Sequence, residues 1–184
     1  MLNQESSEVI NFILITVTYF LPALIANGAP VVFIGKLVKR PRPLDRNVLF
    51  IDGKPILGPN KTLEGFIIGV ASGLIVGVAY SLIFNNVNFT IYGLTMGLGA
   101  MVGDAFNSFI KRRLSIRSGD PFIPMDQLSF IVSSYLLVKV LRIDRLCGIN
   151  LGLKYFSMIV VIVLILHPLS NLVSYVLGLK DKPW

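Results

Sequence analysis

Charged residues are scarce in this chain: they make up 15% of its 184 residues, whereas hydrophobic residues make up 54% and the mean hydropathy is +0.74. This balance excludes an ordinary soluble domain, in which roughly a quarter of the residues are charged. Cysteine is almost absent, and a single Cys147 excludes a disulfide within the chain. No basic segment precedes the first apolar run, so we expect a retained span and no cleaved signal peptide there. The composition therefore indicates an integral membrane protein.

Five apolar segments are long enough to cross a bilayer, which takes about 20 residues. They are residues 9–34, 63–84, 91–111, 122–141 and 155–178. Pro22 and Pro30 interrupt the first segment, which we expect to be kinked or tilted. The sequence shows no internal repeat. It therefore predicts an all-α polytopic membrane protein, a bundle of five transmembrane helices in one domain over residues 1–184, with a long basic loop at 35–62.

The distribution of cations predicts how these spans are oriented, because Lys and Arg gather in short cytoplasmic loops. Three regions that five spans would place on one side are basic, whereas the turn at 85–90 holds no cation. We therefore expect the N-terminus outside and the C-terminus in the cytoplasm of a multi-pass cell-membrane protein. Arg142, Arg145 and Lys154 lie in the loop assigned to the outside, where Asp144 offsets part of their charge. The cytoplasmic cations are Lys36, Lys39, Arg40, Arg42, Arg46, Lys54, Lys61, Lys111, Arg112, Arg113, Arg117, Lys180 and Lys182.

A polar stripe ends the third predicted span. Asp104, Asn107, Ser108, Lys111 and Arg112 follow helical spacing and share one face. Asp104 lies roughly 10–14 Å below the end of that helix, too deep for a short side chain to reach water. A charge at that depth requires a cation, a metal ion or a water-filled cavity. The simplest alternative to a functional site is an internal ion pair with Lys111 or with an Arg of another helix.

Two further segments carry polar groups to the same predicted surface. In LGPNKTLEG, residues 57–65, Thr62 is the expected N-cap of the second helix and Glu64 suits its first turn. In SGDPFIPMDQLS, residues 118–129, prolines open a helix that carries Asp126 and Gln127. Helix N-termini, Lys, Arg and carboxylates together suit a polyanion with a divalent metal. The basic segment 36–61 fits either a cover over this surface or a polybasic stretch on anionic lipid head groups.

Three ordered motifs, GPNKTLEG, GDAFNSFIKRR and IPMDQLS, resemble the archaeal CDP-archaeol synthases, relatives of the phosphatidate cytidylyltransferases. The resemblance extends from residue 26 through the fourth span. It implies an enzyme that transfers CMP from CTP to an isoprenoid glycerol ether lipid phosphate, unsaturated archaetidic acid. The products would be CDP-archaeol and pyrophosphate. The implied cofactor is Mg²⁺, with Mn²⁺ as an alternative, and the implied partners are CTP, the lipid phosphate and membrane lipids, without nucleic acid.

The resemblance also implies roles for individual residues on the cytoplasmic side. Asp104 and Asp126 would hold the metal, and these two and Lys111 would be catalytic. Residues implied in substrate binding are Asn60, Lys61, Thr62, Asn107, Ser108 and Arg112. Two departures stand out: a Gly-His-Gly-Gly element is absent before the second Asp, and Ser129 replaces an acid that is usual three residues after Asp126.

The chemistry is consistent with the shortage of histidine. A phosphate monoester, with a second pKa of about 6, is largely a dianion at neutral pH and needs no strong base to attack. The difficulty is charge repulsion, which cations relieve. His167, the single histidine, precedes Pro168 within the last span, and we interpret it as structural.

Other membrane functions fit less well. An ion or proton transporter using Asp104 is the main alternative, but its polar groups would recur near mid-membrane on several helices. A CDP-alcohol phosphotransferase would carry an Asp-Gly-x-x-Ala-Arg element, and a lipid phosphatase would carry a Pro-Ser-Gly-His element, neither of which occurs. Gly69, Gly73 and Gly77 form a small-residue stripe that suits either packing within the chain or a homodimer.

Overall fold

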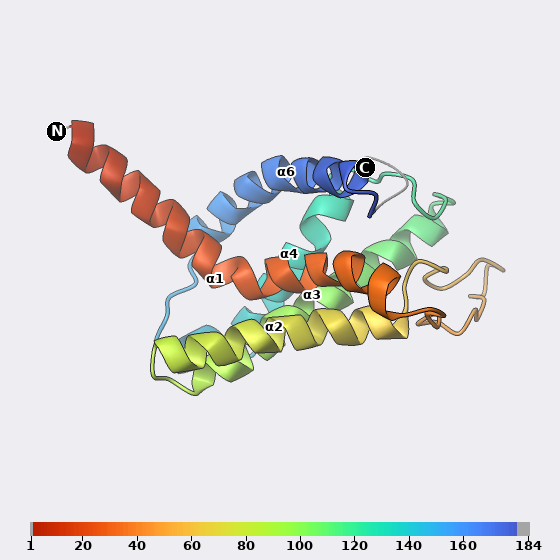
Figure 1. The fold of residues 1–184 in the computed structure, drawn as a ribbon, viewed down its shortest axis with the longest axis horizontal. Helices are drawn as coiled ribbons and strands as arrows, with labels where there is room; N and C mark the ends of the chain where they lie inside the picture. The colour runs from red at the N-terminus through yellow and green to blue at the C-terminus, as the bar shows by residue number, and fades with distance from the viewer. Residues whose placement is uncertain (1, 180–184) are drawn as a thin grey trace.

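The computed structural model describes residues 2–179, which fold into helices joined by loops (Figure 1). Within these residues the extended backbone contacts are limited to two isolated bridges, Pro43 with Thr62 and Leu49 with Pro55. The all-helical prediction is therefore confirmed for the described part of the chain. Lys180 and Lys182, counted above among the cytoplasmic cations, lie outside it. The helices are α1 (Leu2–Leu37), α2 (Leu63–Ile83), α3 (Asn88–Arg113), α4 (Met125–Val140), α5 (Ile143–Leu146) and α6 (Leu153–Val176).

Some predicted boundaries are wrong. Helix α1 is continuous through Pro22 and Pro30 and is longer than the predicted span, with a visible bend along its length (Figure 1). The predicted fourth span began at residue 122, but α4 begins only at Met125, with Pro124 as its N-cap. Proline disfavours the helical conformation in the residue before it, which explains the late start. The short helix α5 was not predicted.

Three helices of the described chain are long and apolar enough to cross a membrane: α1, α2 and α6, with mean hydropathy of 2.2 over their spanning segments. Helix α3 is long but carries Asp104 and three consecutive cations near its end. Helix α4 has only 16 residues. Length and apolarity therefore support three of the five predicted spans.

Helix α3 lies between α2 and α4 and packs against both, whereas α2 and α4 do not contact each other. Glycines allow these close approaches, because each lacks a side chain that would separate the backbones. Gly73 and Gly77 of α2 meet Gly93 and Gly97 of α3 backbone to backbone. On another face of α3, Gly99 and Gly103 meet the serines of α4. The small-residue stripe of α2 is therefore used for packing within the chain.

Helix α1 crosses the other long helices and contributes to the buried core. Its Phe20 is fully buried, as are Met96 of α3 and Ile131 of α4. Two tyrosines also hold α1 in place: the Tyr80 hydroxyl donates to the carbonyl of Thr18, and the Tyr92 hydroxyl to the carbonyl of Tyr19, each at 2.8 Å. The apolar core therefore surrounds α3 and leaves the two ends of the bundle for polar groups.

One end of the bundle, at the α2–α3 turn, holds the segment that follows α4. Asp144 is almost fully buried there and accepts from Lys139 at 2.7 Å. The side chain of Asn88 donates to the carbonyl of Leu146 at 2.8 Å. The opposite end carries the loop at 38–62 and the C-terminal turn of α3, and Figure 1 shows α6 ending toward that side as well.

Candidate functional site

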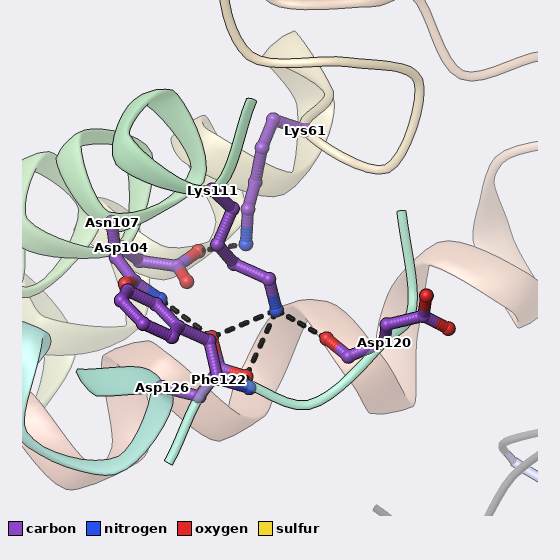
Figure 2. A network of polar contacts seen from close by, with 7 residues as sticks. All are labelled: Lys61, Asp104, Asn107, Lys111, Asp120, Phe122 and Asp126. Carbon is purple, nitrogen blue, oxygen red and sulfur yellow. Dashed lines mark hydrogen bonds and ion pairs between the residues drawn. The ribbon is translucent and has the colours of Figure 1, made fainter. Parts of the chain in front are cut away.

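The predicted site residues meet at the end of the bundle where α3 finishes. Figure 2 shows Lys61, from the loop before α2, and Lys111, from α3, reaching with their side-chain nitrogens toward Asp104 and Asp126. Asp126 comes from the first turn of α4, where a carboxylate is favoured by the helix dipole. The three segments singled out in the sequence are therefore neighbours in space, which helical spacing alone could not establish.

Asp104 is paired with Lys61. The Lys61 Nζ lies 2.5 Å from Asp104 Oδ2, and the two side chains are 27% and 32% exposed. The cation that Asp104 requires thus comes from a loop, so the alternative pairing with Lys111 or with an Arg of another helix is wrong. Because both side chains are partly accessible, an incoming anion or metal ion can reach this pair.

Asp126 accepts hydrogen bonds from three different groups. Asn107 Nδ2 donates at 2.6 Å, the backbone N–H of Phe122 at 2.7 Å, and Lys111 Nζ lies 2.9 Å from Oδ2 and 3.0 Å from Oδ1. Lys111 is buried and also donates to the carbonyl of Asp120 at 2.5 Å. These bonds tie the end of α3 to the loop at 114–124 and to the start of α4.

Lys61 is delivered by a loop whose backbone is anchored on both sides. The amide of Leu44 donates to the Lys61 carbonyl at 2.7 Å, and the amide of Lys61 donates to the Gly58 carbonyl at 3.2 Å. Thr62 is the N-cap of α2, as predicted, and its hydroxyl accepts from the amide of Gly65 at 3.1 Å. The Thr62 hydroxyl oxygen therefore already accepts a hydrogen bond within the chain. To bind a nucleotide as well, the hydroxyl would have to donate its proton to a phosphate oxygen.

Asp45 organises this loop and was missed by sequence reasoning. Its carboxylate accepts from the amides of Leu57, Gly58 and Asn47 at 2.8, 2.9 and 3.0 Å. Burial raises the pKa of Asp45, but these backbone hydrogen bonds outweigh burial and the pKa is lowered overall. Gly58 has a φ of +91°, which a glycine adopts readily, and its backbone lies against the side chain of Arg112. The sequence signal that could have identified this role was an aspartate, Asp45, about a dozen residues before the Gly58-Pro59 turn.

Arg113 was predicted only as one of several cytoplasmic cations, but it clamps the loop to α3. One of its terminal nitrogens lies 2.6 Å from Asp52 Oδ1, and the other donates to the carbonyls of Lys54 and Pro55. Its guanidinium also lies against the rings of Phe50 and Phe109, 4.7 and 4.9 Å from their centroids. A second ion pair, Arg42 with Glu64 at 2.7 Å, holds the other end of the loop to α2.

Other predicted residues lie at the same end with less defined contacts. Ser108 is buried on α3, and Asn60 is exposed in the loop. Arg112 is partly buried. The polar stripe predicted on α3 therefore contacts the loop before α2 and the start of α4. Asn107, Ser108 and Lys111 are its most buried members.

Three buried side-chain atoms of the described residues have no hydrogen-bond partner: Asn107 Oδ1, Arg112 Nε and Arg113 Nε. All three belong to the last turns of α3. A buried polar atom without a partner is costly, and a bound ligand, ion or water molecule is what completes its bonding. The first is an oxygen acceptor suited to a hard cation, and the other two are donors suited to phosphate.

The donor set therefore fits a divalent metal ion. Asp104, Asp126 and the free amide oxygen of Asn107 are hard oxygen ligands from adjacent turns of α3 and the start of α4. Among the residues that the structure describes, no three His, Cys, Asp or Glu side chains are grouped so that they could hold a metal ion by themselves. Magnesium suits such a site, because it is commonly held by one or two carboxylates with substrate phosphates and water completing its shell.

Comparison with known proteins places these features in a family. The CarS-like family model, described as CDP-archaeol synthase, matches residues 9–184. The CDP-archaeol synthase of Staphylothermus marinus is 39% identical over 166 residues, covering 90% of this chain and 90% of that protein. The CDP-archaeol synthase of Thermofilum pendens is 40% identical over 173 residues, covering 90% of this chain and 78% of the relative.

The fold is similar to a solved structure described as an intramembrane enzyme for archaeal membrane lipids biosynthesis. The TM-score is 0.73 at 34% sequence identity, and the match covers 86% of this chain and 94% of the other. The sequence similarity and the fold similarity thus agree, and each covers most of the chain.

Proposed function

Because this chain belongs to the CDP-archaeol synthase family, we propose that it transfers CMP from CTP to an isoprenoid glycerol ether lipid phosphate. The products are CDP-archaeol, an intermediate for archaeal membrane phospholipids, and pyrophosphate. The observation that carries the proposal is the pair of Lys–Asp contacts at one end of α3, Lys61 with Asp104 and Lys111 with Asp126. Two cations and two carboxylates gathered at one end of α3 support a site at which a nucleoside triphosphate and a lipid phosphate meet.

The geometry suits a reaction limited by charge repulsion. The lipid phosphate attacks the α-phosphate of CTP, forming a new P–O bond while the bond to pyrophosphate breaks. Lys61 and Lys111 lie at the site to offset the negative charge of both reactants. Arg112, whose Nε is buried without a partner, supplies a further donor to phosphate oxygens. No proton has to be removed from the attacking dianion, so no histidine is needed.

We further propose Mg²⁺ as the resident metal, held by Asp104, Asp126 and Asn107 Oδ1 and replaceable by Mn²⁺. When bound, the ion would supply positive charge that stabilises the leaving pyrophosphate. In this structure Lys61 and Lys111 hold the two carboxylates, and in the proposed complex these lysines would contact the nucleotide phosphates. Asn60, Thr62 and Ser108 remain proposed substrate contacts.

For the membrane arrangement, we propose five spans with the N-terminus outside and the active site facing the cytoplasm of the cell membrane. Helices α3 and α4 would be the two less apolar spans, because the C-terminal turns of α3 and the first turn of α4 carry the charged residues of the site. The basic loop at the site end supports this orientation, since cations gather in cytoplasmic loops. The turn at 85–90, at the other end of α2 and α3, holds no cation.

The alternative of an ion or proton transporter finds no support in the two relatives described above, both of which are named CDP-archaeol synthase. The geometry also disfavours it. A transport path needs polar groups along the membrane, whereas the mid-helix contacts of α3 are glycines packed against α2 and α4.

The experiment is pyrophosphate release by purified protein in detergent with Mg²⁺. CTP, ATP, GTP and UTP are compared, each with and without an archaeal-type ether lipid phosphate. We expect release only when CTP and the lipid are both present, and loss of release with EDTA. Release with nucleotide alone, or with every nucleotide equally, would contradict the assignment.

Asp104→Asn provides the sharpest variant, and the chain offers a matched control. Asp144 is also paired with a lysine, Lys139, but at the opposite end of the bundle. We expect Asp104→Asn to abolish turnover while the protein remains monodisperse, because the amide cannot hold the metal charge. Asp144→Asn should retain turnover in any preparation that stays folded. If Asp104→Asn were as active as an active, folded Asp144→Asn protein, Asp104 would be removed from the mechanism.

A further inference from the structure

The loop between α1 and α2 contains a tight hairpin over residues 48–56. The amide of Ile56 donates to the carbonyl of Val48 at 3.2 Å, and the amide of Phe50 donates to the carbonyl of Lys54 at 2.8 Å. Gly53, with a φ of +74°, closes the turn, and its amide donates to the carbonyl of Phe50 at 2.9 Å. The four residues Val48–Ile51 form the first arm of this hairpin and the start of its turn, and they are called here the hairpin tip.

The hairpin tip is apolar and exposed. Val48, Leu49, Phe50 and Ile51 are 53%, 59%, 39% and 96% exposed. Exposed apolar residues on the membrane helices face lipid, but these four lie in a loop outside the helices. A run of four exposed apolar residues in water is unfavourable, and such a patch marks an interaction surface.

The hairpin is fixed at the level of the last turn of α3. The Phe50 ring meets the Phe109 ring edge-on with centroids 5.3 Å apart, and the guanidinium of Arg113 lies over both. Lys54 Nζ donates to the carbonyl of Arg113 at 3.1 Å and to Ser115 Oγ at 2.7 Å. The side of α3 near Phe109 continues into apolar surface, since Phe106 is 59% exposed. The hairpin tip thus adjoins the place where an apolar helix surface gives way to cations.

The loop that carries this apolar tip is rich in cations. Lys39, Arg40 and Arg46 are exposed, and none of them forms an ion pair with a described residue. Between residues 38 and 62 the loop holds six cations against two aspartates, Asp45 and Asp52. Apolar side chains flanked by unpaired Lys and Arg are the combination that binds the interfacial layer of a membrane, where acyl chains meet phosphate head groups.

We propose that the hairpin tip inserts into the interfacial layer of the bilayer on the active-site side, with Ile51 and Leu49 at the acyl boundary and the neighbouring cations on lipid phosphates. The ligand is the lipid surface itself. The Asp45 and Arg113 contacts then connect this anchor to the segment that carries Lys61, so the catalytic loop is held at the surface where a lipid phosphate arrives. Insertion does not depend on the reaction proposed above.

The test uses Ile51→Cys labelled with an environment-sensitive fluorophore, in the full chain reconstituted into phosphatidylcholine–phosphatidylglycerol vesicles. Cys147 is only 6% exposed, and the wild-type chain taken through the same labelling measures its background. Asn47→Cys, an exposed polar position in the same loop, is the matched control. Neither position belongs to the proposed catalytic machinery.

For Ile51→Cys we expect a blue-shifted emission, strong quenching by lipids brominated on their acyl chains and weak quenching by aqueous iodide. The Asn47→Cys label should show the reverse. Omitting phosphatidylglycerol should weaken the Ile51 signal, because the cations then lose their anionic partners. Water-like emission at both positions would overturn the proposal. A shift that grows with the protein-to-lipid ratio, together with disulfide crosslinking between chains of the unlabelled Ile51→Cys protein, would instead assign the hairpin tip to a second copy of the chain.

Discussion

Gly93→Ala tests whether the close packing of α2 on α3 positions the active site. A Cβ added at Gly93 would lie 2.4 Å from Gly77 Cα and 2.5 Å from the Gly73 carbonyl oxygen, whereas ordinary contacts begin near 3.4 Å. Both obstructing atoms are backbone, so no side chain can move aside. The helices must therefore separate by about 1 Å at this crossing, because that is the shortfall from ordinary contact.

This separation has two measurable consequences. Overpacking of a helix interface costs about 1–3 kcal/mol, and the better helix propensity of alanine offsets at most about 1 kcal/mol of that. Helix α3 carries Asp104, and Lys61 lies two residues before the start of α2. A displacement of about 1 Å between catalytic groups can lower the rate roughly 100-fold. We therefore expect Gly93→Ala to be less stable and to lose about two orders of magnitude in kcat.

Gly28→Ala is the matched control, because no atom beyond the adjoining backbone of α1 lies within 4 Å of the added Cβ. Both variants are followed by thermal unfolding in detergent and by CTP-dependent pyrophosphate release at saturating substrate. Gly28→Ala should change stability by no more than about 1 kcal/mol and should leave kcat unchanged. If Gly93→Ala matches the wild type in both assays, α2 and α3 do not meet at these glycines and the structural reasoning fails.

Two further changes probe the loop and the helix start. The lowered pKa of Asp45 means that its stabilising contribution is present above the ordinary value of 3.8 and is lost as the pH falls through the lower folded value. The melting temperature should therefore drop on acidification below that range, and Asp45→Asn should flatten this part of the profile; an unchanged profile would contradict it. Thr62→Ala removes the N-cap of α2 and should cost about 1 kcal/mol in thermal unfolding, whereas Thr62→Ser should not. Equal melting temperatures for the two Thr62 variants would refute the cap.

Local features of the fold were readable from the sequence because they depend on neighbouring residues. The N-cap role of Thr62 follows from its place before an apolar run, and the structure confirms it. The shared face of Asn107, Ser108 and Lys111 follows from helical periodicity. The bend of α1 was expected from Pro22 and Pro30, and the helix continues through both because neighbouring helices can support a helix where a proline removes one hydrogen bond.

Pairings between distant residues were not readable. Asp104 required a cation, but the choice of Lys61 over Lys111 depends on how the loop returns to α3, 43 residues away along the chain. Arg113 looked like one cation in a basic run, and only the folded loop brings Phe50 and Asp52 to it. Such contacts depend on chain paths that no short-range pattern encodes.

The sequence by itself determined that this is a membrane protein of the all-helical class, and it singled out the residues of the candidate site, because hydropathy, periodicity and ordered motifs are properties of the chain as written. Only the tertiary structure decided that α3 stands between α2 and α4, which lysine faces which aspartate, and that the loop closes onto α3 through Arg113. The physical reason is close packing. Glycine faces set which helices can approach, and that approach brings the charges of separate segments within hydrogen-bonding distance.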